Sequence, residues 1–276
     1  MSIQVLKPKF HVDECLDQIR ECLEQGWTGM GFKTVEFEDV WKKYTGHPHA
    51  YYINSDTVGL HLAVKILKMQ NGWHDGDEII TTPITFISTP HSILYENLHA
   101  TFADVDEYLC LDPADVEKKI NEKTRAVIFV GYGGRVGQLD KIELCKKHNL
   151  RLILDAAHMA GTKVNGVCPG TWDGVDVTVY SYQAVKNLPT GDSGMICFAN
   201  EENDKIARQL AWLGINKDTY ARSNAGTYKW KYDVDYVGYK YNGNAVMAAI
   251  ALVQLKYLDE ENARRREIVK KYNDAF

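Results

Sequence analysis

The apolar residues in the first 45 positions have the spacing of two amphipathic helices. In each segment they recur every three or four residues, which places them on one face of a helix. The residues that carry this spacing are Leu16, Ile19 and Leu23 in the first helix and Phe37, Val40, Trp41 and Tyr44 in the second. Gly29 and Gly31 lie between the two segments, where we predict a turn.

From residue 50 to residue 198, short apolar runs alternate with segments of helical spacing. The predicted strands are 50–53, 78–81, 101–103, 126–130, 151–154, 175–181 and 194–198. The predicted helices are 58–69, 89–95, 113–120 and 138–148. Such alternation is typical of a mostly parallel sheet covered by helices on both faces. We therefore predict an α/β fold, in which ligands bind beyond the carboxyl ends of the strands.

The pattern changes after about residue 200. A helix to Leu213 is followed by a polar, aromatic-rich stretch over 216–244, and then by a final helix with a charged tail. The expected apolar face of that helix consists of Val246, Met247, Ile250, Val253, Tyr257 and Leu258. We predict a large domain over 1–240 and a separate C-terminal helix over 241–276.

Composition and charge narrow the class of protein. Of the 276 residues, 45% are hydrophobic and 25% are charged, which is ordinary for a soluble globular protein. The formal net charge of −5 gives no attraction to nucleic acid or to an anionic membrane. We interpret the run Arg264-Arg265-Arg266 as a solvated helix face. We therefore expect neither a nucleic-acid partner nor a membrane partner.

Cysteine usage and the N-terminus indicate the compartment. The six cysteines are scattered and form no CxxC pair, which favours reduced, mostly buried thiols over a zinc cluster or a disulfide framework. Positions 1–10 contain no apolar run suited to a signal peptide, and no stretch has transmembrane length. We expect a cytoplasmic protein without a metal site.

Asp155 and Lys186 are the two candidates for catalysis. Asp155 ends a predicted strand, where a buried carboxylate requires a cation or hydrogen-bond donors. The protonated ring nitrogen of pyridoxal phosphate (PLP) is such a cation, and its protonation makes PLP a better electron sink. Lys186 follows the next strand, where it can form an imine and act as a general base. The alternatives are a helix-capping Asp155 and a solvated Lys186.

Other residues at strand ends are candidates for holding a cofactor. Ser55, Asp56 and Thr57 open a helix directly after a strand, where free N–H groups can bind a phosphate. An ordinary N-cap is the alternative. Phe86 can stack on an aromatic cofactor or pack in the core. His158 either touches the cofactor or is a satisfied polar residue.

In combination these segments resemble the DegT/StrS family of nucleotide-sugar aminotransferases, a branch of the fold-type I PLP enzymes. The similarity runs from about Gly26 to Tyr272. The segments that carry it are Asp155-Ala-Ala-His158, Ser181-Tyr-Gln-Ala-Val-Lys186-Asn, Thr85-Phe86-Ile-Ser-Thr89, Ser55-Asp56-Thr57 and Gly238-Tyr-Lys240-Tyr-Asn242. The resemblance implies the large domain of a fold-type I enzyme.

The resemblance also implies roles in the active site. Lys186 would hold PLP as a Schiff base and shuttle a proton, and Asp155 would keep the ring nitrogen protonated. Ser181 and the backbone of Asp56 and Thr57 would bind the phosphate.

Further roles concern the ring and the second subunit. Phe86 would cover one face of the ring, with Ala157 or His158 near the other. Lys240 would reach the phosphate across the interface of a homodimer. An amino acid, typically glutamate, would donate the amino group, and a keto-sugar on a nucleotide would accept it.

The chain departs from the family pattern at several points. Asp56 stands where the family has glycine, Lys240 where it has asparagine and Gln183 where it commonly has histidine. The small C-terminal domain of the family is absent or only begun at Phe276. Two alternatives therefore stay open: a sugar dehydratase, against which the retained Lys186 argues, and a non-catalytic descendant that binds PLP or a partner.

Overall fold

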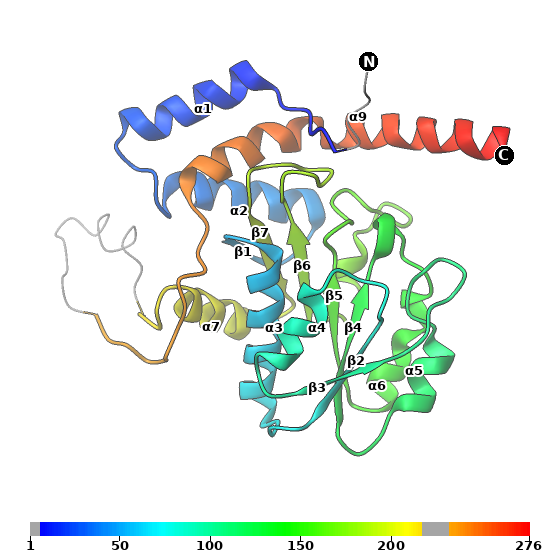
Figure 1. Ribbon diagram of the computed structural model, residues 1–276. Helices are drawn as coiled ribbons and strands as arrows, with labels where there is room; N and C mark the ends of the chain where they lie inside the picture. The colour runs from blue at the N-terminus through cyan, green and yellow to red at the C-terminus, as the bar shows by residue number, and fades with distance from the viewer. Residues whose placement is uncertain (1–5, 217–231) are drawn as a thin grey trace.

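The computed structural model describes residues 6–216 and 232–276. Its centre is a seven-stranded sheet in the order β1-β7-β6-β5-β4-β2-β3 (Figure 1). The strands are β1 (His49–Ile53), β2 (Glu78–Thr81), β3 (His99–Phe102), β4 (Thr124–Val130), β5 (Arg151–Asp155), β6 (Val177–Ser181) and β7 (Gly194–Phe198). The predicted mostly parallel α/β sheet is thereby confirmed.

Strand β7 is the exception to the parallel arrangement, because it pairs antiparallel with both β6 and β1. Ser181 at the end of β6 is opposite Gly194 at the start of β7. The connection between them is a loop rather than a crossover helix, and a short loop can join only antiparallel neighbours. This loop carries Lys186, so the reversal returns the chain to the sheet directly after that residue.

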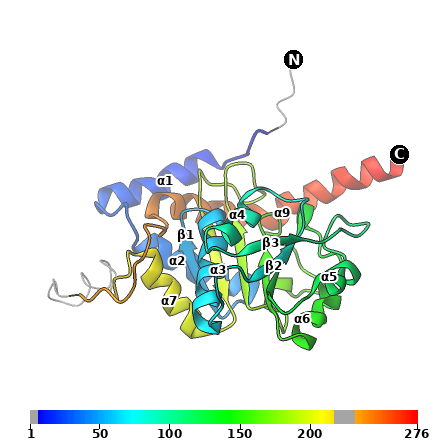
Figure 2. The ribbon, with the colours of Figure 1, turned by 60° about the horizontal axis from the view of Figure 1, so that its bottom comes forward.

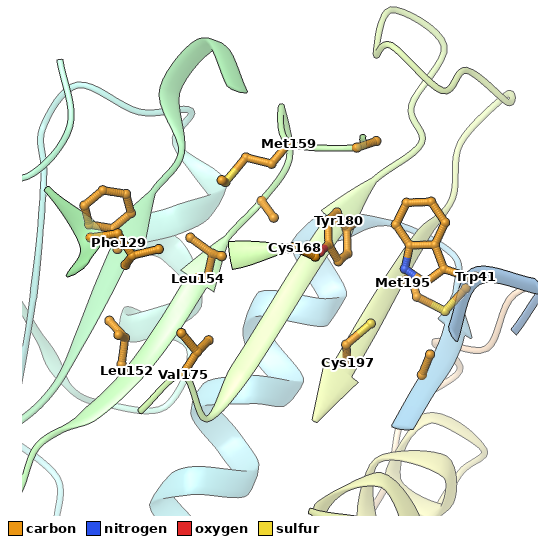
Figure 3. Packing of buried hydrophobic residues seen from close by; sticks show 14 of the residues in the cluster. Trp41, Phe129, Leu152, Leu154, Met159, Cys168, Val175, Tyr180, Met195 and Cys197 are labelled. Atoms are coloured by element: carbon orange, nitrogen blue, oxygen red, sulfur yellow. Dashed lines mark hydrogen bonds between the residues drawn. The ribbon is translucent and has the colours of Figure 1, made fainter. Parts of the chain in front are cut away.

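Helices cover both faces of the sheet, and each strand buries alternate residues on opposite sides. In β4, Ala126 and Ile128 pack with one group of helices, whereas Val127 and Phe129 pack with the other. The first group is α3 (Asp56–Asn71), α4 (Ser88–Leu94) and α7 (Glu201–Ala211). The second is α2 (Phe32–Thr45), α5 (Pro113–Lys119), α6 (Leu144–Lys147) and α9 (Ala245–Ala275). Figure 3 shows part of this second core, with Trp41 beside Tyr180 and Met195.

The long helix α9 differs from its prediction. Its first half lies between α1 (Val12–Glu24) and α2, so burial extends beyond a single face (Figure 1; Figure 2). Ala248 and Leu252 are buried, whereas Val246, Met247 and Ile250 are only partly buried. The predicted apolar face is therefore wrong in detail, because two neighbours select different sides of the helix. The charged tail is helical to Ala275 and extends past the sheet (Figure 1).

Several boundaries also differ from the prediction. The helix expected over 138–148 is a 3₁₀ segment, Leu139–Glu143, followed by the short α6. Leu139 and Leu144 are buried, but the first turn is tightened into a 3₁₀ segment. Of the stretch predicted as polar and aromatic-rich, residues 217–231 lie outside the described part of the chain.

The remaining expectations concern thiols and membranes. All six cysteines are buried and free, as predicted. Within residues 6–216 and 232–276, no helix is long and apolar enough to cross a bilayer.

Candidate active site

A cavity of about 560 Å³ lies at the carboxyl ends of the parallel strands. Turns after β1, β2, β4, β5 and β6 contribute its walls, as expected for this class of sheet. It brings together Ser55 and Lys186, which are 131 positions apart in the sequence. The predicted site residues that line it are Ser55, Asp56, Thr57, Phe86, Asp155, His158, Ser181 and Lys186.

Asp155 occupies the last position of β5 and is only 4% exposed. Its Oδ2 accepts a hydrogen bond from the Thr89 hydroxyl at 2.8 Å, and its Oδ1 accepts one from the Ala157 N–H at 3.2 Å. Burial raises the pKa of this carboxyl in spite of both bonds. Among the described residues it has no ion-pair partner. A cation in the cavity would therefore stabilise its charged form.

Lys186 lies in the loop between β6 and β7. Its backbone N–H donates to the Gln183 carbonyl at 2.8 Å, and the Gln183 side chain accepts from the Val185 N–H at 3.0 Å. These bonds hold a tight turn that presents Lys186 to the cavity. Its positive charge lowers the pKa of Asp155 and of Asp56 against the effect of burial. One amine and two buried carboxyls therefore share this cavity.

The N-terminus of α3 also lines the cavity. Ser55 is the N-cap, and its hydroxyl accepts from the Val58 N–H at 3.4 Å. Free N–H groups and the helix dipole make this end attractive to an anion. Ser181, 5% exposed at the end of β6, lines the same cavity. These groups suit a phosphate, apart from the carboxyl of Asp56.

Gly194 lets β7 approach the first turn of α3. A Cβ at this position would lie 2.8 Å from the Asp56 backbone nitrogen and 2.8 Å from the Tyr180 carbonyl oxygen. Both are backbone atoms, which cannot move aside as a flexible side chain does. Any larger residue would therefore push the helix N-terminus away from the strand.

We expect Gly194→Ala to lower the free energy of unfolding by about 1–3 kcal/mol, the usual penalty of overpacking. It should also weaken cofactor binding, because α3 would move. Urea denaturation and a cofactor titration would measure the two effects. Gly29→Ala is the control, since a Cβ there meets nothing within 4 Å. Equal stability of the two variants would contradict the close approach.

Phe86 and His158 both line the cavity. Phe86 is 75% exposed at the mouth of the cavity, so it is not a core residue. The His158 Nδ1 accepts from the Gly133 N–H at 3.2 Å, and its ring meets Tyr132 edge-on. Burial and the charge of Lys186 lower the pKa of His158, which favours the neutral ring. Both side chains are thus available to contact a flat aromatic ring.

Sequence reasoning missed three residues of the site. Thr89 donates to Asp155, while Tyr132 and Asp192 line the cavity. Tyr132 follows β4, so the rule that ligands bind at strand ends was sufficient to find it. Thr89 was part of a quoted segment, but nothing in the sequence indicates its bond across 66 positions to Asp155.

Lys240 does not line the cavity of its own chain. Its Nζ lies over the Trp212 ring, 3.1 Å from the centroid, and its carbonyl accepts from the Asn54 side chain. The predicted role of Lys240 across a subunit interface stays a prediction.

A second, more open groove of about 1010 Å³ adjoins the cavity and shares His158, Val185 and Lys186 with it. Lys163 lines this groove, and so do Arg265 and Arg266. Asp259 is the carboxylate in its wall, and it accepts a hydrogen bond from Tyr44. The groove therefore carries excess positive charge. The three arginines 264–266 are exposed as expected, and two of them face this groove.

Three observed features agree with the fold-type I PLP aminotransferases that the sequence resembles. They are the sheet, the lysine after β6 and the carboxyl at the end of β5. The chain belongs to the DegT/DnrJ/EryC1/StrS aminotransferase family, which it matches over residues 11–276. It is 37% identical over 265 residues to the spore coat polysaccharide biosynthesis protein SpsC of Bacillus subtilis, covering 95% of this chain and 66% of SpsC. The chain thus spans about two thirds of the length of that relative.

Solved structures agree with the family assignment. The aminotransferase TlmJ from Streptoalloteichus hindustanus has a TM-score of 0.88 and 34% identity, covering 99% of this chain and 71% of TlmJ. The PLP form of Spr1654 from Streptococcus pneumoniae, a putative sugar aminotransferase, has a TM-score of 0.89 and 26% identity, covering 100% of this chain and 72% of Spr1654. The predicted family, fold class, enzyme class and PLP cofactor are therefore confirmed.

The residues of the cavity fit PLP at three points. Asp155 is a buried carboxyl that lacks a cation, which the protonated ring nitrogen would supply. Lys186 is an amine at the cavity wall, and the N-terminus of α3 is ready for a phosphate. One feature is unusual in such a site, namely the carboxyl of Asp56.

Proposed function

We propose that this protein transfers an amino group from an amino acid, in the first instance glutamate, to a keto-sugar carried on a nucleotide. Lys186 would be the covalent attachment point of the cofactor and the carrier of the proton. The observation that carries the proposal is the presence of Lys186 and Asp155 in one cavity at the carboxyl edge of the sheet.

Bound PLP supplies a ring that withdraws electrons from the substrate carbon. The residues of this chain would do the rest. Asp155, oriented by Thr89 and the Ala157 N–H, would hold the proton on the ring nitrogen. The Lys186 amine would remove and return the proton at the substrate carbon, as a general base and acid. Phe86 and His158 would cover the ring and limit the access of water.

Two observations support a nucleotide-linked sugar as the acceptor. The name of SpsC refers to polysaccharide biosynthesis, and Spr1654 is described as a putative sugar aminotransferase. The groove beside Lys186 carries Lys163, Arg265 and Arg266, and the phosphates of a nucleotide would complement their charge. The sugar would then lie in the cavity beside Lys186, and its nucleotide would lie in the adjoining groove with its phosphates near these cations.

We propose further that the active protein is a homodimer. Exposed apolar side chains on and beside α4, near the cavity, support a second copy on this face: Phe86, Ile87, Leu94 and Tyr95. In such a dimer, Lys240 of one copy would contact the cofactor phosphate of the other. Residues 1–240 would form the PLP-binding domain, and residues 241–276 a C-terminal helix. A cytoplasmic location stays a prediction.

The test is to follow the visible absorption of the PLP-loaded protein through both half-reactions. Glutamate should convert the bound cofactor to its amine form, and a nucleotide-linked keto-sugar should convert it back with release of an amino-sugar. The same keto-sugar without its nucleotide is the control and should react poorly. Binding of PLP without reaction toward any amino acid would favour the non-catalytic alternative.

A further inference from the structure

Asp56, the first residue of α3, has a buried carboxyl oxygen that lacks a hydrogen-bond partner in the described part of the chain. The residue is 8% exposed and lines the cofactor cavity. Its Oδ1 is buried and has no hydrogen-bond partner among the described residues. An ionised carboxylate in this position would lose its hydration with no hydrogen bond to Oδ1 in exchange, which is unfavourable.

The surroundings of Asp56 make ionisation still harder. The charged and titratable side chains that line the cavity with it are Asp155 from β5, His158 and Tyr132 from the turns after β5 and β4, and Lys186 and Asp192 from the β6–β7 loop. Burial raises the pKa of Asp56 well above its usual range, the negative charge of Asp155 raises it further, and Lys186 opposes both. Burial also raises the pKa of Asp192, and His158 favours its neutral form.

A phosphate at the N-terminus of α3 would add negative charge at the same end of the cavity. The backbone of β7 adjoins the Asp56 nitrogen so closely that Gly194 cannot carry a Cβ, so the first turn of α3 cannot retreat toward the strand. An ionised Asp56 and a dianionic phosphate would therefore repel each other at short range. A protonated Asp56 has the opposite effect, because its O–H is a hydrogen-bond donor.

We propose that Asp56 binds the cofactor phosphate as a neutral carboxylic acid, so that binding of the phosphorylated cofactor is coupled to uptake of a proton. The proposal rests on the proposed function, which places the phosphate at α3. The O–H of Asp56 donates to a phosphate oxygen, and no covalent bond forms or breaks.

The sign of the pH effect follows from the proton balance. Where the free protein has lost the proton from Asp56, the complex must recover it from solvent. Affinity for the cofactor then falls by up to about tenfold for each unit of rising pH. Asp56→Asn keeps a neutral donor at all pH values and removes this dependence, and Asp56→Gly removes both the donor and the repulsion.

The experiment is calorimetric titration of the apo-protein with pyridoxamine 5′-phosphate between pH 6.5 and 8.5. This ligand carries the phosphate but forms no imine with lysine, so protonation of Lys186 for covalent attachment does not enter. Buffers of different ionisation enthalpy give the number of protons taken up. The phosphate of the free ligand titrates at about pH 6, so at the upper end of this range the free ligand is mostly dianionic in every titration. Asp13→Asn, an exposed carboxylate in the first turn of α1, is the matched control.

We expect the wild type and Asp13→Asn to take up more protons than Asp56→Gly and Asp56→Asn, and the difference to approach one proton as the pH rises above the pKa of Asp56 in the free protein. Unphosphorylated pyridoxamine should show no such difference. Equal proton uptake by the wild type and both Asp56 variants would overturn the proposal. If proton uptake is equal but PLP still gives a borohydride-stable adduct on Lys186, the role of Asp56 is rejected and the proposed function is retained. If no variant binds either cofactor, both fail.

Discussion

Replacement of Lys186 by alanine is expected to abolish covalent attachment of PLP and to lower the rate of transamination by about 10⁴-fold, the upper range for loss of a positioned acid–base group. The fold should persist, because Lys186 is partly exposed and its side chain makes no ion pair within the described residues. Borohydride reduction followed by peptide mass mapping measures attachment, and an assay with glutamate and a nucleotide-linked keto-sugar measures turnover.

Two controls separate the chemistry of Lys186 from its charge. Lys186→Arg keeps a cation in the cavity with Asp56 and Asp155 but has no amine that forms an imine, so it should retain the electrostatics and lose the adduct. Lys163→Ala removes a lysine that lies over the Tyr44 ring in the neighbouring groove, and it should retain the adduct. An adduct or near wild-type turnover in Lys186→Ala would remove Lys186 from the mechanism.

Asp155→Asn is expected to leave PLP attached to Lys186 but to slow the half-reaction with glutamate by about 10²–10⁴-fold. The reason is that asparagine removes the charged partner of the ring nitrogen. Loss of one partner from a buried ion pair costs about 3–5 kcal/mol. If this cost is added to the activation barrier, each 1.36 kcal/mol slows the reaction tenfold. The asparagine has the same shape and can still accept a hydrogen bond from Thr89, so the cavity should be preserved. Stopped-flow absorption of the bound cofactor would measure the rate.

The matched control for this prediction is Asp173→Asn. Its side chain is 97% exposed and pairs with Lys146, away from the cavity. It removes the same charge from the protein, so its half-reaction should proceed at the wild-type rate. If Asp155→Asn reacted as fast as this control, the carboxyl would not be the partner of the ring nitrogen.

Much of the fold was predictable because it depends on local patterns. The strands predicted at 78–81 and 194–198 have the observed bounds, since short apolar runs are buried on both faces in such a sheet. The site followed from the same pattern: Asp155 and Lys186 come after neighbouring strands, and parallel strands end at one edge. This rule gave weight to Ser55 and Lys186, which are 131 positions apart and line one cavity, and the family resemblance then selected them as site residues.

The apolar face of α9 could not be derived in this way. A helix that lies between two neighbours buries more than one side, and the positions of α1 and α2 decide which residues those are. The antiparallel direction of β7 has a similar origin. Its apolar run would suit either direction, and only the loop that returns from β6 determines the pairing.

What the sequence by itself determined is the α/β architecture, the family and the set of residues at the strand ends, because each depends on residue type and spacing along the chain. Only the tertiary structure decided how those residues are charged and paired. The bond from Thr89 to Asp155 and the positive groove formed by Lys163 and Arg266 join distant segments. The Oδ1 of Asp56 is buried by the fold and has no hydrogen-bond partner within the described part of the chain. Burial and electrostatic energies depend on distances in space, which spacing along a sequence does not contain.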